Sequence, residues 1–193
     1  VVGLAHVEGD VDVRECHMLQ TLSLCMEPSE YLQEFFSMIK TLPIKDFRLQ
    51  LIPKIDEDWG FLRKPPAFNE QLCLPQAEKL RLLIEDRSGV ARINFSAPCL
   101  KVLSLRVVST LCVFDEPMPL LREAHVSVTH NMWNIYDALF AFSPQLQVAH
   151  FCYASHASDN QTFQLPSNMR SLRELVILSH GNCFNFDFST FSR

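Results

Sequence analysis

The chain repeats one short pattern of apolar residues seven times, and this repetition constrains its fold more than any other feature. Each copy has three apolar anchors in the spacing L-x-x-L-x-L, with mostly polar residues between them. The copies are Leu19-Leu22-Leu24, Ile44-Phe47-Leu49, Ala77-Leu80-Leu82, Leu100-Leu103-Leu105, Leu121-Ala124-Val126, Leu146-Ala149-Phe151 and Leu172-Leu175-Ile177. Successive first anchors are 25, 33, 23, 21, 25 and 26 residues apart. A repeat of this length predicts a stack of similar structural units.

The spacing inside each copy predicts a β-strand, and together with the repeat length it predicts a leucine-rich-repeat solenoid. The last two anchors alternate with polar residues, which is the period of a strand with one buried face. Of the positions between anchors, only Val102, Val148 and Val176 are apolar. One unit cannot bury its own anchors, so about seven irregular units must stack and share a core. The predicted fold class is α/β, with a curved parallel sheet on the concave side and mixed helices, short strands and loops on the convex side.

The segments between the predicted strands have several different patterns. A helix is expected from Ser29 to Lys40, because apolar residues recur there on one helical face, Ser29 suits the N-cap and Pro43 ends the run. A second helix is expected near Trp133 to Phe142. Between Asp86 and Met118 the apolar residues alternate instead, which predicts an extended return path. The convex side is therefore expected to be irregular.

Bulk properties limit the classes of partner and the location. A length of 193 residues suits one domain over 1–193, and because the first residue is Val we expect it to be a fragment of a longer protein. The net charge of −5 argues against a nucleic-acid partner. No run approaches the roughly 20 apolar residues that span a bilayer, so no membrane insertion is expected. Seven cysteines without CxxC pairs favour reduced thiols and a cytoplasmic or nuclear location, against which the two glycosylation sequons at Asn94 and Asn160 weigh little.

Stacked units would place equivalent polar residues in columns along the concave sheet face. The central column is predicted to contain Ser23, Arg48, Arg81, Ser104, His125, His150 and Val176. The candidate partner-binding residues of this face are Arg48, Lys79, Arg81, Arg106, His125 and His150. The arginines and the lysine could hold a carboxylate, a phosphate or an acidic peptide. Alternatively, they pair with Asp46 and Glu123 on a solvated face, and we favour this second interpretation.

Other kinds of site have less support in the sequence. His125, His150 and Cys152 would be neighbours, but three ligands fall short of a structural zinc site, and two stacked histidines are more often only exposed. We therefore predict no metal site and no cofactor. The chain has no nucleophile elbow, no phosphate-binding glycine loop and no His-Glu-x-x-His motif, so no catalytic residue is assigned and we expect a protein that is not an enzyme.

The longest interval between anchors contains a segment, 53–75, that we expect to form a long loop between units. It carries an acidic triplet, two consecutive prolines, Trp59 and Phe61. Insertions in solenoids lie at the rim and often carry binding residues. Trp59 and Phe61 could anchor a partner there, or they could fold back onto the core.

Part of the chain resembles a known family. The stretch INFSAPCLKVLSLRV, from Ile93 to Val107, resembles the repeat of plant F-box proteins with leucine-rich repeats, which often read Ala-Pro-x-Leu-x-x-Leu-x-Leu. The next unit, from Phe114 to Val128, looks like a variant in which Met118-Pro119 replaces Ala-Pro, and MRSLRELVILSH, from Met169 to His180, resembles later units. The resemblance covers about 20–193 loosely and 93–128 well.

This resemblance implies the substrate-binding repeat region of an adaptor in a cullin ubiquitin ligase. A protein substrate or peptide would bind the concave face. The family's F-box is not found in the chain, because LPIKDFRLQL, from Leu42 to Leu51, has a similar start but continues into a predicted strand. A Skp-type subunit is therefore expected as a partner only if an F-box precedes Val1. The alternatives are a repeat fragment of an intracellular nucleotide-binding immune receptor and a generic protein-interaction scaffold.

Overall fold

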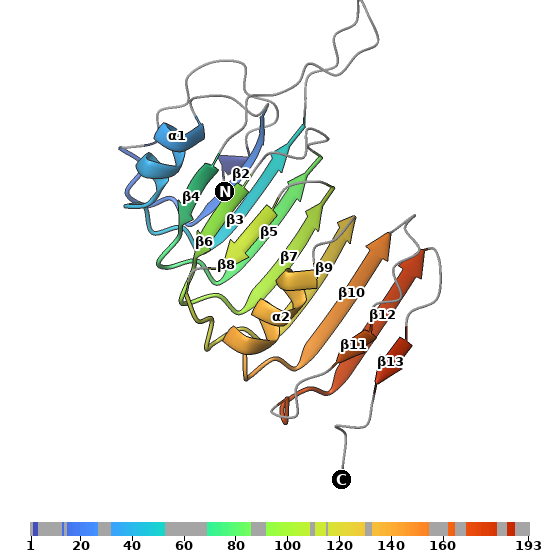
Figure 1. Cartoon of the computed structure of the whole chain (residues 1–193). Helices are drawn as coiled ribbons and strands as arrows, with labels where there is room; N and C mark the ends of the chain where they lie inside the picture. The colour runs from blue at the N-terminus through green and yellow to red at the C-terminus, as the bar shows by residue number, and fades with distance from the viewer. Residues whose placement is uncertain are drawn as a thin grey trace, which may run out of the picture.

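The protein is a parallel-sheet solenoid with few helices (Figure 1). The computed structural model describes residues 2–3, 13, 15–26, 32–52, 69–85, 92–108, 111–114, 116–129, 133–154, 162–164, 169–180 and 185–187. The described strands form one large sheet and two small ones. Neighbouring strands of the large sheet run parallel, as the sequence predicts.

The large sheet contains eight strands in the order β1-β2-β3-β5-β7-β9-β10-β12. These strands are β1 (Val2–Gly3), β2 (Thr21–Met26), β3 (Asp46–Leu51), β5 (Lys79–Ile84), β7 (Val102–Val107), β9 (Glu123–Thr129), β10 (Val148–Ala154) and β12 (Glu174–His180). The second and third anchors of every copy of the pattern lie in one of the strands from β2 to β12. The alternation of apolar and polar residues therefore locates seven of the eight strands.

The first anchor of each copy lies at a turn that leads into the strand. The amide N–H of Leu100 donates to the carbonyl of Ala97 at 3.1 Å, and Leu121 bonds to Met118 at the same distance. The next residue continues the ladder between units, since the carbonyl of Gln20 accepts from the N–H groups of Lys45 (2.8 Å) and Asp46 (3.0 Å). The same arrangement recurs from unit to unit as far as β12. Backbone groups at the turns are thus satisfied both within the turn and by the neighbouring unit.

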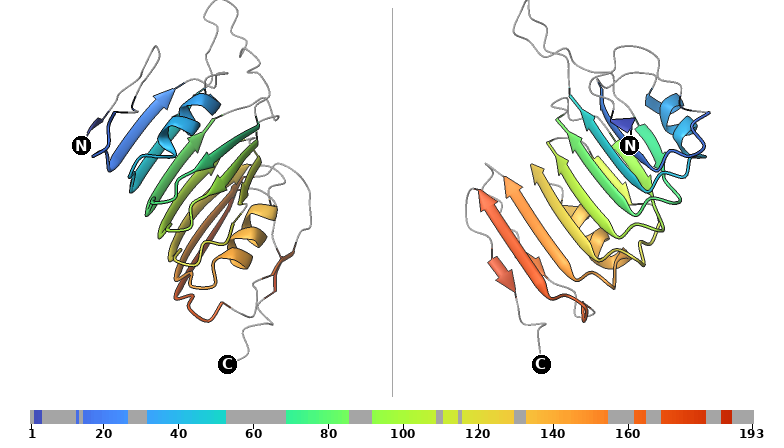
Figure 2. Two further views of the ribbon diagram at one scale, coloured as in Figure 1. Left: turned by 90° about the vertical axis from the view of Figure 1, so that its left-hand side faces the viewer. Right: turned by 180° about the vertical axis from the view of Figure 1, so that it is seen from behind.

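A second layer covers one face of the large sheet (Figure 2). Its elements are α1 (Leu32–Ile39), α2 (Trp133–Phe142), the three-stranded sheet β4 (Asn69–Cys73), β6 (Arg92–Ser96) and β8 (Leu111–Phe114), and the pair β11 (Thr162–Gln164) and β13 (Asn185–Asp187). The helix predicted at 133–142 has the expected bounds. The first helix is described from Leu32, and its predicted cap, Ser29, lies outside the described residues. The extended return path is confirmed as β6 and β8.

The core lies between the two layers. In β3, Phe47, Leu49 and Leu51 are buried, whereas Asp46, Arg48 and Gln50 between them are at least partly exposed. Aromatic residues join α2 to the large sheet, because the ring of Tyr136 lies 4.6 Å from that of Phe151. Burial decreases at β12, where the anchors Leu175 and Ile177 are only partly buried.

The segment 53–75, which we expect to be a long loop, is in part a strand. Residues 69–73 form β4, which pairs in parallel with β6 in the second layer. Residues 53–68, with Trp59 and Phe61, lie outside the described residues. No helix in the described part of the chain has the length and apolar character needed to cross a membrane.

Candidate functional site: the open face of the large sheet

The face of the large sheet that points away from the second layer is the candidate binding surface, and we call it the open face. Its residues form three rows across the strands, each aligned by the strand register. One flanking row contains Thr21, Asp46, Lys79, Val102, Glu123, Val148 and Glu174, and the other contains Cys25, Gln50, Leu83, Arg106, Ser127, Cys152 and Leu178. The central row contains Ser23, Arg48, Arg81, Ser104, His125, His150 and Val176. The described elements of the second layer all lie on the other side of the sheet in both views (Figure 2). Each open-face residue from β2 to β12 in these rows is partly or fully exposed.

Four cationic side chains, Arg48, Lys79, Arg81 and Arg106, lie on the neighbouring strands β3, β5 and β7, and we call them the basic patch. Arg48 and Arg81 are direct neighbours in the register of β3 and β5, so their backbones are about 4.8 Å apart. Lys79 lies two residues before Arg81 on the same face. Arg106 lies one strand further and is exposed like the other three. The structure therefore brings together the four basic residues proposed from the sequence.

Arg48 has an acidic partner on its own strand. Its Nη2 donates to Oδ2 of Asp46 at 3.2 Å, and its Nε donates to Oδ1 at 3.4 Å. The hydrogen bond and the charge of Asp46 raise the pKa of the Arg48 guanidinium above its ordinary value, so it is always charged. Among the described carboxylates, none forms an ion pair with Lys79, Arg81 or Arg106. The pairing expected for a solvated face is thus present at Arg48.

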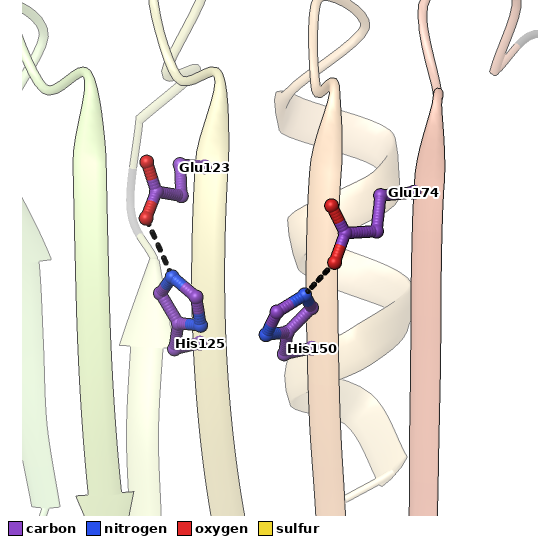
Figure 3. A network of polar contacts seen from close by, with 4 residues as sticks. All are labelled: Glu123, His125, His150 and Glu174. Atoms are coloured by element: carbon purple, nitrogen blue, oxygen red, sulfur yellow. Dashed lines mark hydrogen bonds and ion pairs between the residues drawn. The ribbon is translucent and has the colours of Figure 1, made fainter.

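The other half of the open face carries Glu123, His125, His150 and Glu174, which we call the His–Glu cluster (Figure 3). Nε2 of His125 lies 2.6 Å from Oε1 of Glu123 on β9, and Nε2 of His150 lies 2.7 Å from Oε1 of Glu174 on β12. The two imidazole rings meet edge to face, with centroids 4.6 Å apart. Glu123, which we considered as a partner for the arginines, is therefore bonded to His125.

The two histidines are neighbours in the register of β9 and β10, as predicted, and Cys152 follows His150 by two residues on the same face. No group of three metal-binding side chains suited to a metal ion occurs within the part of the chain that the structure describes. Each histidine instead has a carboxylate within hydrogen-bond distance. Trp59 and Phe61, the candidate loop contacts, lie outside the described residues.

One buried carboxyl group was not singled out from the sequence. Glu70 of β4 is only 7% exposed, and within the described structure its Oε2 has no hydrogen-bond partner. Burial raises the pKa of this carboxyl group. The sequence does carry a signal for this burial. Glu70 and Leu72 are two residues apart in β4, so they lie on the same face of the strand, and Leu72 is buried. Its isolation from the open face makes it a feature of the core rather than of the binding surface.

Comparison with known proteins identifies no relative. No protein-family model, no curated protein and no solved structure matches the chain. The function must therefore be inferred from the surface itself.

Proposed function

We propose that the chain is a non-enzymatic protein-recognition domain, a leucine-rich-repeat solenoid that binds a segment of a partner protein on its open face. The observation that carries this proposal is the difference between the two faces of the large sheet. Parallel sheets are normally covered on both faces. Here the described elements cover one face, and the other presents three rows of exposed or half-exposed side chains in register over seven strands. Such a face offers a partner an ordered set of contacts.

The candidate contacts are the basic patch together with His125 and His150. These residues project from strands, so their backbones are held by ladders on both sides. Sites on strands are positioned more rigidly than sites on loops, which lowers the entropic cost of binding. The described pairs Glu123–His125 and His150–Glu174 would fix the histidine side chains as well as their backbones.

Mapping of selected ligands tests the proposal. Peptides would be selected from a random display library against the purified chain and measured against two variants. Ser104→Trp places a bulky neutral side chain in the middle of the open face, and Gln71→Trp places one on the exposed side of β4 in the second layer. We expect Ser104→Trp to abolish binding of most selected peptides, and Gln71→Trp to leave it within about twofold. Circular dichroism would verify that both variants fold.

Two results would contradict this proposal. One is a set of peptides that is insensitive to Ser104→Trp and sensitive to Gln71→Trp, because binding would then occur at the second layer. The other is the absence of any peptide that the open-face variant affects after repeated selections.

The resemblance of 93–128 to plant F-box proteins extends the proposal to a cellular role. On this basis the chain would select substrates for a cullin ubiquitin ligase, with the ligase contacts made by an F-box elsewhere in the full-length protein. Co-purification tests this role: the full-length protein should retain a Skp-type subunit, and the 193-residue chain alone should not. Failure of the full-length protein to retain the subunit would remove the ligase role and leave the recognition proposal intact.

A further inference from the structure

We infer that the partner segment is acidic and that it binds in an extended conformation across β3, β5 and β7, on the basic patch. This inference rests on the proposed function and names the class of ligand for the same face. The anionic groups that contact the basic patch would be carboxylate side chains of the partner segment.

The first argument is that two arginines lie directly opposite each other in the basic patch. Arg48 and Arg81 are register neighbours, and like charges directly opposite each other on neighbouring strands are destabilising. Lys79 adds a third positive charge on the same face of β5, where it is the register neighbour of Asp46, whose carboxylate is bonded to Arg48. The chain as a whole carries a net charge of −5, so the basic patch is a local excess of positive charge on a negatively charged protein. A bound anionic segment would offset the repulsion.

The second argument is that two carboxylates of the open-face rows, Asp46 and Glu123, are already engaged. Glu123, one strand beyond Arg106, lies 2.6 Å from His125, and Asp46 is held by Arg48. Within the described structure this leaves Lys79, Arg81 and Arg106 without an ion-pair partner. Glu123 and Glu174 also limit the site, because they repel an acidic segment from β9 and β12. The acidic ligand is therefore confined to the three strands of the patch.

The third argument concerns the shape of the site. The patch extends over two strand spacings, or about 10 Å, and an extended peptide covers this distance with about three residues. Its cations come from three strands, and Arg106 is offset by two residues from the register of Arg48 and Arg81, which suits several side-chain carboxylates better than one phosphate. Arginine guanidinium groups bind carboxylates through two parallel hydrogen bonds. Apart from the two histidines, the three rows contain no aromatic residue on which nucleic-acid bases could stack.

Fluorescence anisotropy with a labelled peptide of about eight residues that alternates Glu and Ser tests the inference. We expect Arg81→Glu to weaken the Kd about tenfold or more. The matched control is Arg92→Glu on β6, which makes the same change in net charge on the exposed side of the second layer. We expect that control to change the Kd by less than about threefold. Binding should also weaken as salt is raised from about 0.05 to 0.5 M.

A second variant is expected to act in the opposite direction. Asp46→Asn removes the acidic partner of Arg48, so Arg48 becomes available to the ligand and a local negative charge is lost. We expect it to tighten peptide binding several-fold. Thermal unfolding provides an independent readout, because Arg81→Glu places a carboxylate opposite Arg48 and should leave the fold at least as stable as the original.

Three outcomes would overturn the inference. Equal losses in Arg81→Glu and Arg92→Glu would show attraction to the whole molecule and no defined site. Tighter binding of inorganic phosphate or single-stranded oligothymidylate than of the peptide would point to another class of ligand. Library peptides that bind the open face but carry no acidic residues would refute the acidic segment while supporting protein recognition itself.

Discussion

At the scale of single residues, Glu70 is the most unusual group in the core. It lies in β4 beside Ile93 of β6 in the register of the small sheet, and both residues are buried. Burial disfavours a charged carboxylate, so it raises the pKa of this group in the folded state. The folded state therefore holds its proton to higher pH than the unfolded state, and stability falls as pH rises through that interval.

The first prediction follows from this linkage. Glu70→Gln removes the ionisation and keeps the shape, so the variant should gain stability relative to the original as pH rises above about 4.5, the ordinary value of the group. We expect a relative gain of about 1 kcal/mol at neutral pH, the lower range for an unsatisfied buried group. Urea unfolding at a series of pH values provides the measurement. The exposed Glu15→Gln is the control, and an equal pH dependence of both variants would contradict the prediction.

A second residue-scale prediction concerns the thiol groups. Burial raises the pKa of Cys112 in β8, so it is a poor nucleophile in the folded state, whereas Cys16 is exposed. Under native conditions at about pH 8, iodoacetamide should modify Cys16 at least tenfold faster than Cys112. Peptide mass spectrometry resolves the two sites. Similar rates under native conditions would show that β8 opens frequently and would contradict the prediction. As a control, the two rates should become equal in denaturant.

At the scale of elements, the large sheet was far more predictable than the second layer. Apolar and polar residues alternate over four positions in most copies, and a shift by one residue would expose every anchor, so this pattern predicts the register as well as the strands. The strands β11 and β13 were missed because runs of three residues give little periodic signal. The strand β4 was missed because we assigned its residues to the long loop 53–75. Side-chain pairing was also hard to predict, since Glu123 could reach either an arginine or His125, and rotamers decide between them.

The third prediction tests how α2 is held on the sheet. The ring of Phe151 in β10 lies 4.6 Å from that of Tyr136 and 5.5 Å from that of Phe140. Phe151→Ala should reduce the free energy of unfolding by about 3–5 kcal/mol, because it leaves a cavity in a packed aromatic group. Val148→Ala, on the open face of the same strand, should cost about 1 kcal/mol or less. Denaturant titration measures both, and equal costs would contradict the assignment of inner and outer faces.

At the scale of the whole molecule, each unit contacts mainly its neighbours, so stability is expected to vary along the chain. Strands in the middle have a neighbour on both sides, while β12 is at the end of the described sheet order. Leu103 and Leu105 of β7 are each 1% exposed, but the equivalent Leu175 and Ile177 of β12 are only partly buried. Leu178 on the open face of β12 is 55% exposed.

The fourth prediction concerns this gradient. In hydrogen exchange followed by mass spectrometry, the backbone amides of 174–180 should exchange faster than those of 102–107, by about tenfold or more. Equal protection would show that the molecule opens as a single cooperative unit. The basic patch lies on β3, β5 and β7, which have a neighbouring strand on both sides in the described sheet order.

The mixed second layer also has a mechanical consequence. A helix with its side chains is about 10 Å wide, whereas neighbouring strands are about 4.8 Å apart, so a helix behind the sheet forces its units to splay. In β4, β6 and β8 the second layer has the same spacing as the large sheet in front of it. We therefore expect the solenoid to bend where α1 and α2 lie and to run straight between them. That straight section contains β5 and β7, so a ligand there would bind a flat surface of the sheet and not a concave one.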